Sequence, residues 1–111
     1  MDDSSPRVNS AFLGRYVGKK VRLACKVVNV NLADRRATVE ASDAGKVEVQ
    51  LHGEDHGLEA SKFVEIVGMV VDATTIKPMV VIKLGDTLDM SIVERAVKMM
   101  HEDRFAELFR P

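Results

Sequence analysis

The chain has 111 residues, of which 46% are hydrophobic and 30% charged, with a net charge of −1; this is typical of one globular domain. Proteins that bind nucleic acid mainly through its phosphates are basic, so this charge disfavours a chain that follows a phosphate backbone on its own. Cys25 is the only cysteine, which excludes an internal disulfide and a cysteine zinc site and fits a reducing compartment. The acidic, polar start and the lack of an apolar run of about 20 residues predict neither a secretory signal nor a membrane span.

The first part of the chain predicts a tail followed by a short helix. Residues 1–8 are expected to form a flexible tail. Asn9 or Ser10 is a suitable N-cap for a helix over residues 11–17, whose apolar residues fall on one side. Gly18 is expected to end this helix.

Three strands are predicted next, and the first contains an irregularity. Apolar residues alternate with polar ones from residue 19 to residue 31, but the phase changes after Val27. One extra residue moves all later side chains to the other face of a sheet, so this change predicts a bulge or bend; a strand buried on both faces explains it equally well. Residues 37–41 and 47–51 each show one apolar and one polar face, joined by a turn at residues 43–45 in which glycine is available for a positive φ.

The second part of the barrel is predicted from two further strands. Residues 52–62 are polar and form a connection with at most one helical turn. A fourth strand over residues 63–73 is apolar on both faces, and Gly68 inside it marks a bend or a close backbone approach. After a turn, Pro78 opens a fifth strand over residues 79–84. Its apolar residues on one face are Val80, Ile82 and Leu84.

The order of these elements predicts an all-β fold with flanking helices. Three strands, a longer connection, two strands and a bent first strand meet the conditions of a five-stranded OB-fold barrel with a short N-terminal helix and a long C-terminal helix. An SH3-like barrel is the structural alternative, but it usually lacks the long connection and the closing helix. The predicted division is a tail over residues 1–8, the barrel with its N-terminal helix over 9–86, and an oligomerisation helix with a tail over 87–111.

The strongest helical pattern lies over residues 91–101. Ser91 followed by Glu94 predicts a capping box at its start, and His101 is placed to interact with the carbonyl end of the helix. The apolar residues span an arc of about 160°, although packing on one sheet needs only about 100°. These residues are Ile92, Val93, Ala96, Val97, Met99 and Met100. The width is consistent with two neighbours, the barrel and a second body, or with a helix that covers an open end of its own barrel.

The residues that usually carry catalytic or metal chemistry do not form a recognisable motif. His52 and His56 have the i, i+4 spacing of helical zinc ligands, but Gly53 and Gly57 disfavour a helix there. A solvated acidic loop is the preferred interpretation. Cys25 alternates with apolar residues and is interpreted as a small buried hydrophobe. We therefore expect no enzymatic activity, no metal site and no cofactor.

The predicted second and third strands lack the aromatic residues on which OB folds stack single-stranded bases. The outward positions there are mixed in charge: Thr38, Glu40, Lys46, Glu48 and Gln50. Arg35, Arg36 and Lys77 are candidates for weak DNA contacts, but solvated loop charges are the simpler interpretation because salt screens isolated surface charges.

Three segments resemble the smallest subunit of replication protein A, the eukaryotic heterotrimer that coats single-stranded DNA. Arg7-Val8-Asn9 is similar to the segment before the first helix of that family, residues 63–70 to its fourth strand including the glycine, and residues 94–101 to its closing helix including the histidine. The resemblance runs from about residue 7 to residue 101. After His101 it weakens, because residues 102–109 are compatible with continued helix where the family has a proline-containing aromatic tail; a break is expected near residue 103.

The resemblance implies an OB fold whose C-terminal helix joins helices of the middle and large subunits in a three-helix bundle. It implies a nuclear protein of DNA replication, repair and recombination that assembles the complex, while its partners bind most of the single-stranded DNA. The six apolar helix residues named above would form the subunit interface. Two alternatives stay open: a stand-alone OB-fold binder of single-stranded nucleic acid, and an OB-fold adaptor of another complex, such as a telomeric one.

Overall fold

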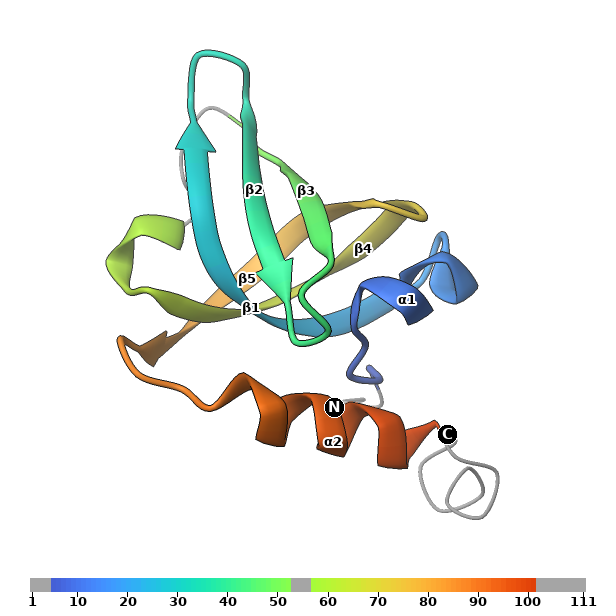
Figure 1. The fold of residues 1–111 in the computed structure, drawn as a ribbon. Helices are drawn as coiled ribbons and strands as arrows, with labels where there is room; N and C mark the ends of the chain where they lie inside the picture. Colours follow the sequence, from blue (N-terminus) through green and yellow to red (C-terminus); the bar gives the residue numbers. More distant parts are fainter. Residues whose placement is uncertain (1–4, 53–56, 102–111) are drawn as a thin grey trace.

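The computed structural model describes residues 5–52 and 57–101 as a small β-barrel with helices on its outside (Figure 1). Its elements are α1 (Ser10–Leu13), the 3-10 helix η1 (Gly14–Tyr16), β1 (Lys20–Asn31), β2 (Arg36–Ala41), β3 (Lys46–Gln50), the 3-10 helix η2 (Leu58–Ala60), β4 (Phe63–Asp72), β5 (Thr75–Gly85) and α2 (Met90–Met100). The strands close in the order β1-β2-β3-β5-β4. None of the helices within the described residues is long and apolar enough to span a membrane.

β1 belongs to both halves of the barrel because it bends in the middle. Its residues 20–26 pair with β4 and its residues 25–31 pair with β2, both antiparallel. The β1–β2 register shifts between Val27 and Asn29. This irregularity confirms the bulge predicted from the change of phase after Val27, since one extra residue reverses which face each later side chain occupies.

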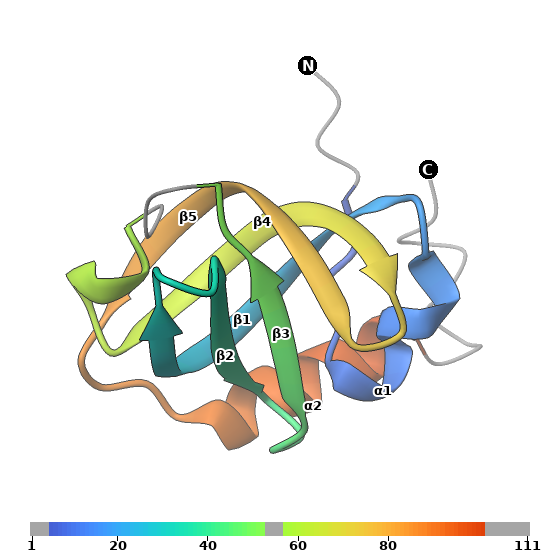
Figure 2. The same cartoon turned by 90° about the horizontal axis from the view of Figure 1, so that it is seen from above.

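The barrel closes through a short parallel contact between β3 and β5, seen from above in Figure 2. Only two residue pairs make this contact, Glu48 with Thr75 and Val49 with Ile76, whereas β5 pairs with β4 as far as Gly85. The result is the predicted class, a five-stranded, mostly β fold with flanking helices. The C-terminal helix is not long as predicted: α2 has 11 residues, an ordinary length.

Side chains from all five strands fill the barrel. The largest fully buried ones are Leu13, Leu23, Leu58, Ile66 and Ile76, together with valines from β1, β2, β3 and β4. Leu58 comes from η2, which packs against β1 and β5, and Leu13 comes from α1. The two short helical segments therefore contribute to the core as well as to the connections.

Residues 6–8 belong to the fold, where the sequence predicts a tail. The Val8 N–H donates to the Arg22 carbonyl and the Arg22 N–H donates to the Pro6 carbonyl, each at 2.9 Å. Val8 is buried. Three residues are too few for periodicity to indicate a strand-like contact, which explains the error. The remaining predicted tail residues 1–4 and the segment after His101, including the break expected near residue 103, lie outside the described residues.

The β4–β5 hairpin has a longer second strand and a shorter turn than predicted. β5 begins at Thr75, and Pro78 lies inside it, at a shift of register next to Gly68. Proline is tolerated there because a bulge releases it from the hydrogen-bonding ladder. A Cβ on Gly68 would lie 2.3 Å from the Lys77 carbonyl oxygen. The close backbone approach predicted for Gly68 is therefore confirmed.

We predict that Gly68→Ala lowers the free energy of unfolding by about 1–3 kcal/mol, because the new methyl group must displace the β5 backbone. The matched variant is Ala44→Gly in the β2–β3 turn, where Ala44 has φ +67°. Removing that strain should raise the free energy of unfolding by about 1 kcal/mol. Urea denaturation of both variants measures the two changes. Equal effects of the two substitutions would contradict this explanation.

Candidate protein-interaction site

α2 begins at a different cap from the one predicted. Asp89 is the N-cap, and its Oδ1 accepts hydrogen bonds from the N–H and the hydroxyl of Ser91. The side-chain hydrogen bond from Ser91 is the main cause that lowers the pKa of Asp89. The predicted capping box between Ser91 and Glu94 is wrong, because Asp89 occupies the cap position and Glu94 turns toward other elements.

Glu94 fastens the inner side of α2 to the rest of the molecule. Its carboxylate accepts hydrogen bonds from the Asn9 amide at 3.0 and 3.1 Å and from the Ser42 hydroxyl at 2.7 Å. Asn9 is also the N-cap of α1, where its Oδ1 accepts from the Phe12 N–H at 3.0 Å. One side chain thus connects α2 with the start of α1 and with the end of β2.

The β2–β3 turn is held against α1 by Asp43. Its carboxylate accepts from the Ser10 hydroxyl at 2.9 and 2.8 Å and from the Ala11 N–H at 3.1 Å. Partial burial raises the pKa of Asp43, but these hydrogen bonds together with those from backbone N–H groups outweigh it and lower the pKa. The predicted positive φ at Gly45 lies instead at Ala44. Gly45 is needed because a Cβ there would lie 1.8 Å from the Ser10 hydroxyl oxygen.

His101, the C-cap of α2, fixes the other end of this helix. Its ring stacks on Phe12 with centroids 4.3 Å apart and an interplanar angle of 20°. Its Nε2 lies 3.0 Å from the Arg7 carbonyl oxygen, which can only accept, so Nε2 carries the hydrogen. The Tyr16 hydroxyl lies 3.5 Å from Nδ1. The histidine stands at the helix end as predicted, but its partners come from α1, η1 and the N-terminal segment.

These inner contacts divide the apolar arc of α2 into two sides. Val97 is only 1% exposed, and Val93 and Met100 are half-buried. On the outer side Ile92 is 61% exposed and Met99 42% exposed. We call the exposed residues of the arc the outer stripe: Ile92, Ala96 and Met99. Their spacing of four and three residues places them in one row along the helix.

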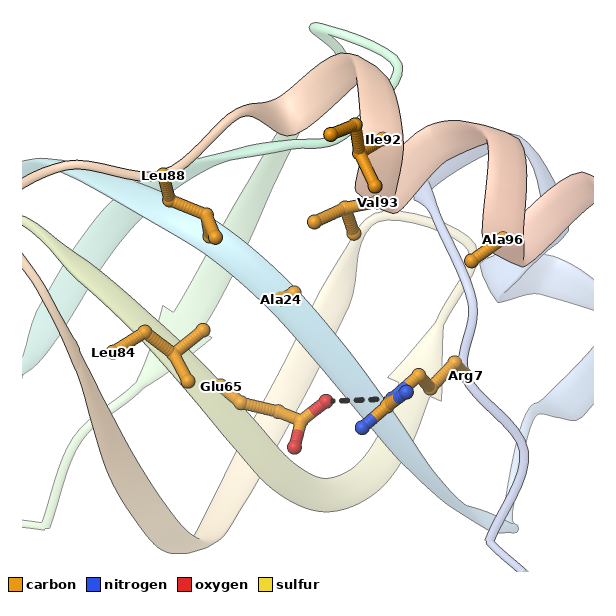
Figure 3. Close-up of a pocket in the computed structure, with 8 residues that line it drawn as sticks. All are labelled: Arg7, Ala24, Glu65, Leu84, Leu88, Ile92, Val93 and Ala96. Carbon is orange, nitrogen blue, oxygen red and sulfur yellow. Dashed lines mark hydrogen bonds and ion pairs between the residues drawn. The ribbon is translucent and has the colours of Figure 1, made fainter.

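A groove of about 290 Å³ runs between α2 and the outer face of the barrel (Figure 3). Its apolar lining consists of Ala24, Leu84, Leu88, Ile92, Val93 and Ala96. Its polar lining is an ion pair, in which the Arg7 Nε donates to the Glu65 carboxylate at 3.1 Å. Arg22 lies 3.5 Å from the other oxygen of this carboxylate, so the buried charge of Glu65 is compensated.

This groove is absent from the sequence-based prediction. The one residue in the sequence that could have indicated this groove is Glu65, because it is a charged residue in the middle of a predicted strand with apolar residues on both faces. Such a residue needs a partner when it is buried. The partner Arg7 is 58 positions away in the chain, in a segment predicted as tail, so the pattern alone did not connect them.

The predicted candidates for DNA contact do not form one basic surface. Arg36 donates to Glu48, and Lys46 lies 2.9 Å from the carboxylate of Glu40, so cations of β2 and β3 pair with carboxylates of the same sheet. The bond with Lys46 lowers the pKa of Glu40. Arg35 lies in the β1–β2 turn with φ +57°. Lys77 lies instead on β5, opposite Met69 of β4.

The histidine and cysteine residues considered for metal binding or catalysis lie only partly within the described residues. Residues 5–52 and 57–101 contain no group of three side chains suited to hold a metal ion, and His56 lies outside the described residues. Cys25 is fully buried, and its thiol lies 3.6 Å from the Val64 carbonyl oxygen. Burial, with a smaller effect of the Glu65 charge, raises the pKa of Cys25 to about 12. This thiol is therefore unreactive at neutral pH.

A closed five-stranded barrel with a parallel β3–β5 contact and a helix against its side defines an OB-type fold. The chain belongs to the Replication factor A protein 3 family, whose model matches residues 1–109. It is similar to a chain in the structure of U. maydis replication protein A bound to ssDNA, with 30% identity, full coverage of both chains and a TM-score of 0.85. The resemblance to the smallest subunit of replication protein A is confirmed.

A second solved structure shares the fold alone. A chain of the S. pombe Stn1-ten1 complex has a TM-score of 0.65 at 13% identity, over 89% of this chain and 93% of that chain. No curated protein matches the sequence.

We predict that Asp43→Asn destabilises the protein by about 1 kcal/mol at pH 7, as does the loss of a capping carboxylate elsewhere. Because the pKa of Asp43 is lower in the folded protein, its contribution is fully present above the ordinary carboxyl pKa and is lost as the pH falls through the lowered pKa of the folded state. Urea denaturation at pH 7 and at pH 3 should therefore show a difference in the free energy of unfolding between variant and wild type that is smaller at pH 3 than at pH 7. A difference that stays constant with pH would contradict this role.

Proposed function

We propose that this chain is the small structural subunit of a replication protein A-like heterotrimer and that α2 joins helices of the middle and large subunits in a three-helix bundle. The observation that supports this most is the outer stripe. Ile92, Ala96 and Met99 face solvent on a helix whose opposite side is already packed on the barrel. The oligomerisation segment in this proposal is residues 87–111.

The fixed position of α2 favours assembly on physical grounds. The contacts of Glu94 and His101 hold both halves of the helix against the barrel before any partner arrives. A partner helix therefore meets a formed apolar surface, and less conformational entropy is lost on binding. Exposed methionine at position 99 also suits this role, since its flexible side chain adapts to a partner's surface.

In this proposal the chain has no catalytic role and no cofactor, and the complex reaches single-stranded DNA mainly through the larger subunits. The complex acts in the nucleus in DNA replication, repair and recombination. Support comes from the full-length similarity to a chain of a replication protein A structure that contains ssDNA. It also comes from β2 and β3, which carry no aromatic residue and whose charges pair with one another.

The two alternatives receive less support. A stand-alone binder would use Arg35, Arg36 and Lys77, but Arg36 is paired with Glu48 and Lys77 lies on a different strand. An adaptor of a telomeric complex would share the fold seen in the S. pombe chain, and that likeness extends to the fold alone. Affinity purification followed by mass spectrometry separates these possibilities, because it identifies the partners.

We predict that Ile92→Asp abolishes co-purification of the chain with the middle and large subunits, because a charge would be buried without a partner in the seam between helices. Position 92 is 61% exposed in the free chain, so the variant should fold normally. Val97 would be a poor choice for this test, since it is already buried within this chain, so that a charge there would disturb folding as well as assembly.

The matched control is Val28→Asp on β1, a residue that is 50% exposed, lies at the register shift between β1 and β2 and does not line the groove beside α2. This variant should assemble like the wild type. Circular dichroism of both variants confirms that they fold. Normal assembly of the Ile92 variant would overturn the proposed interface.

A further inference from the structure

We propose that the groove between α2 and the barrel is the seat of one partner helix, and that this amphipathic helix carries an acidic side chain that binds Arg7. The inference rests on the proposed function and deepens it. It assigns part of the partner surface to the β-barrel itself, at Leu84 and Glu65, in addition to α2.

The apolar lining of the groove has the form that a helix requires. Ile92 and Ala96 stand one helical turn apart along one side, and Leu84 lies on the other side with Glu65 (Figure 3). Residues spaced by one turn form a straight row, which receives the aliphatic residues of a second helix at i, i+3 or i+4, and i+7. The volume of about 290 Å³ is enough for a few such side chains.

The groove is continuous with the outer stripe. Ile92 and Ala96 belong to both, since they line the groove and are also exposed on α2. A helix that covers the outer stripe at these two residues is therefore brought next to Leu84 and Leu88. Together the two surfaces form one larger apolar area, which is the usual sign of an interaction site on a soluble domain.

The charge of Arg7 at one end of the groove determines which side chain a partner helix should place there. The side chain of Glu65 is 8% exposed, whereas that of Arg7 is 51% exposed. Arg7 uses its Nε for Glu65, and a guanidinium carries further donors on its terminal nitrogens. A carboxylate on the incoming helix can thus bind Arg7 while Glu65 stays paired, and such charge-assisted hydrogen bonds are strong. A lysine at the same place would meet a like charge.

The first test uses Leu84→Cys in the full chain. The native Cys25 is buried and its pKa is raised to about 12, so a maleimide should label only the introduced thiol. Labelling is measured in the free chain and after assembly with the middle and large subunits. We expect labelling to be lost on assembly, whereas Val28→Cys, at a 50% exposed position, should label equally in both states.

Each outcome of this test decides between the proposals. If no complex forms with the wild-type chain, the proposed function and this inference both fail. If the complex forms and the thiol at position 84 stays reactive, the inference alone fails. Protection of this thiol by a single-stranded oligonucleotide without partner subunits would also overturn it, because the groove would then bind nucleic acid.

The second test examines the acidic residue of the partner. Glu65→Gln keeps the charge of Arg7, so assembly should be as tight as in the wild type. The double variant Arg7→Gln with Glu65→Gln removes both charges without leaving one of the two buried alone, and it should weaken assembly about tenfold or more. Thermal unfolding of both variants verifies that the barrel is intact. Equal affinity of the two variants would overturn the acidic contact.

Discussion

Glu94 accepts hydrogen bonds from Asn9 and Ser42 on the inner side of α2, and this carboxylate connects the helix with two other parts of the chain. Asn9 in turn caps α1, and the turn after Ser42 is bound to α1 through Asp43. The start of α1, the β2–β3 turn and α2 therefore form one connected polar cluster. Buried or half-buried polar groups of this kind are costly when unpaired, so the cluster permits one orientation of α2.

One fixed orientation gives the two sides of α2 different roles. On the inner side Val97 is buried, while on the outer side Ile92 and Met99 remain exposed to solvent. The same orientation creates the groove, because one wall belongs to α2 and the other to residues of β1, β4 and β5 with Arg7. The helix thus contributes to the stability of the chain through its inner side and keeps a formed apolar surface exposed on its outer side, which is the surface that partner helices would meet in the proposed function.

The sequence predicted those features that depend on neighbouring residues. Strand alternation gave the five strands and the bulge after Val27, because the side-chain period is a local property, and helical periodicity gave the wide arc of α2. The predictions that were wrong concern features that depend on contacts between residues far apart in the sequence. Glu94 has the spacing of a capping box, but its partner Asn9 is 85 positions away. Local sequence patterns also could not predict the pairing of Arg7 with Glu65, which are 58 positions apart, and therefore did not predict the groove that these residues line.

The division of α2 into two sides can be measured directly with methyl NMR and a soluble paramagnetic agent. The samples carry labelled methyl groups at Ile92, Ala96 and Val97, in the free chain and in the chain assembled with the middle and large subunits. In the free chain the agent should broaden the signals of Ile92 and Ala96 and leave Val97, which is 1% exposed, unchanged. In the assembled complex all three signals should be protected. Broadening of the Ile92 signal that persists in the complex would contradict the account.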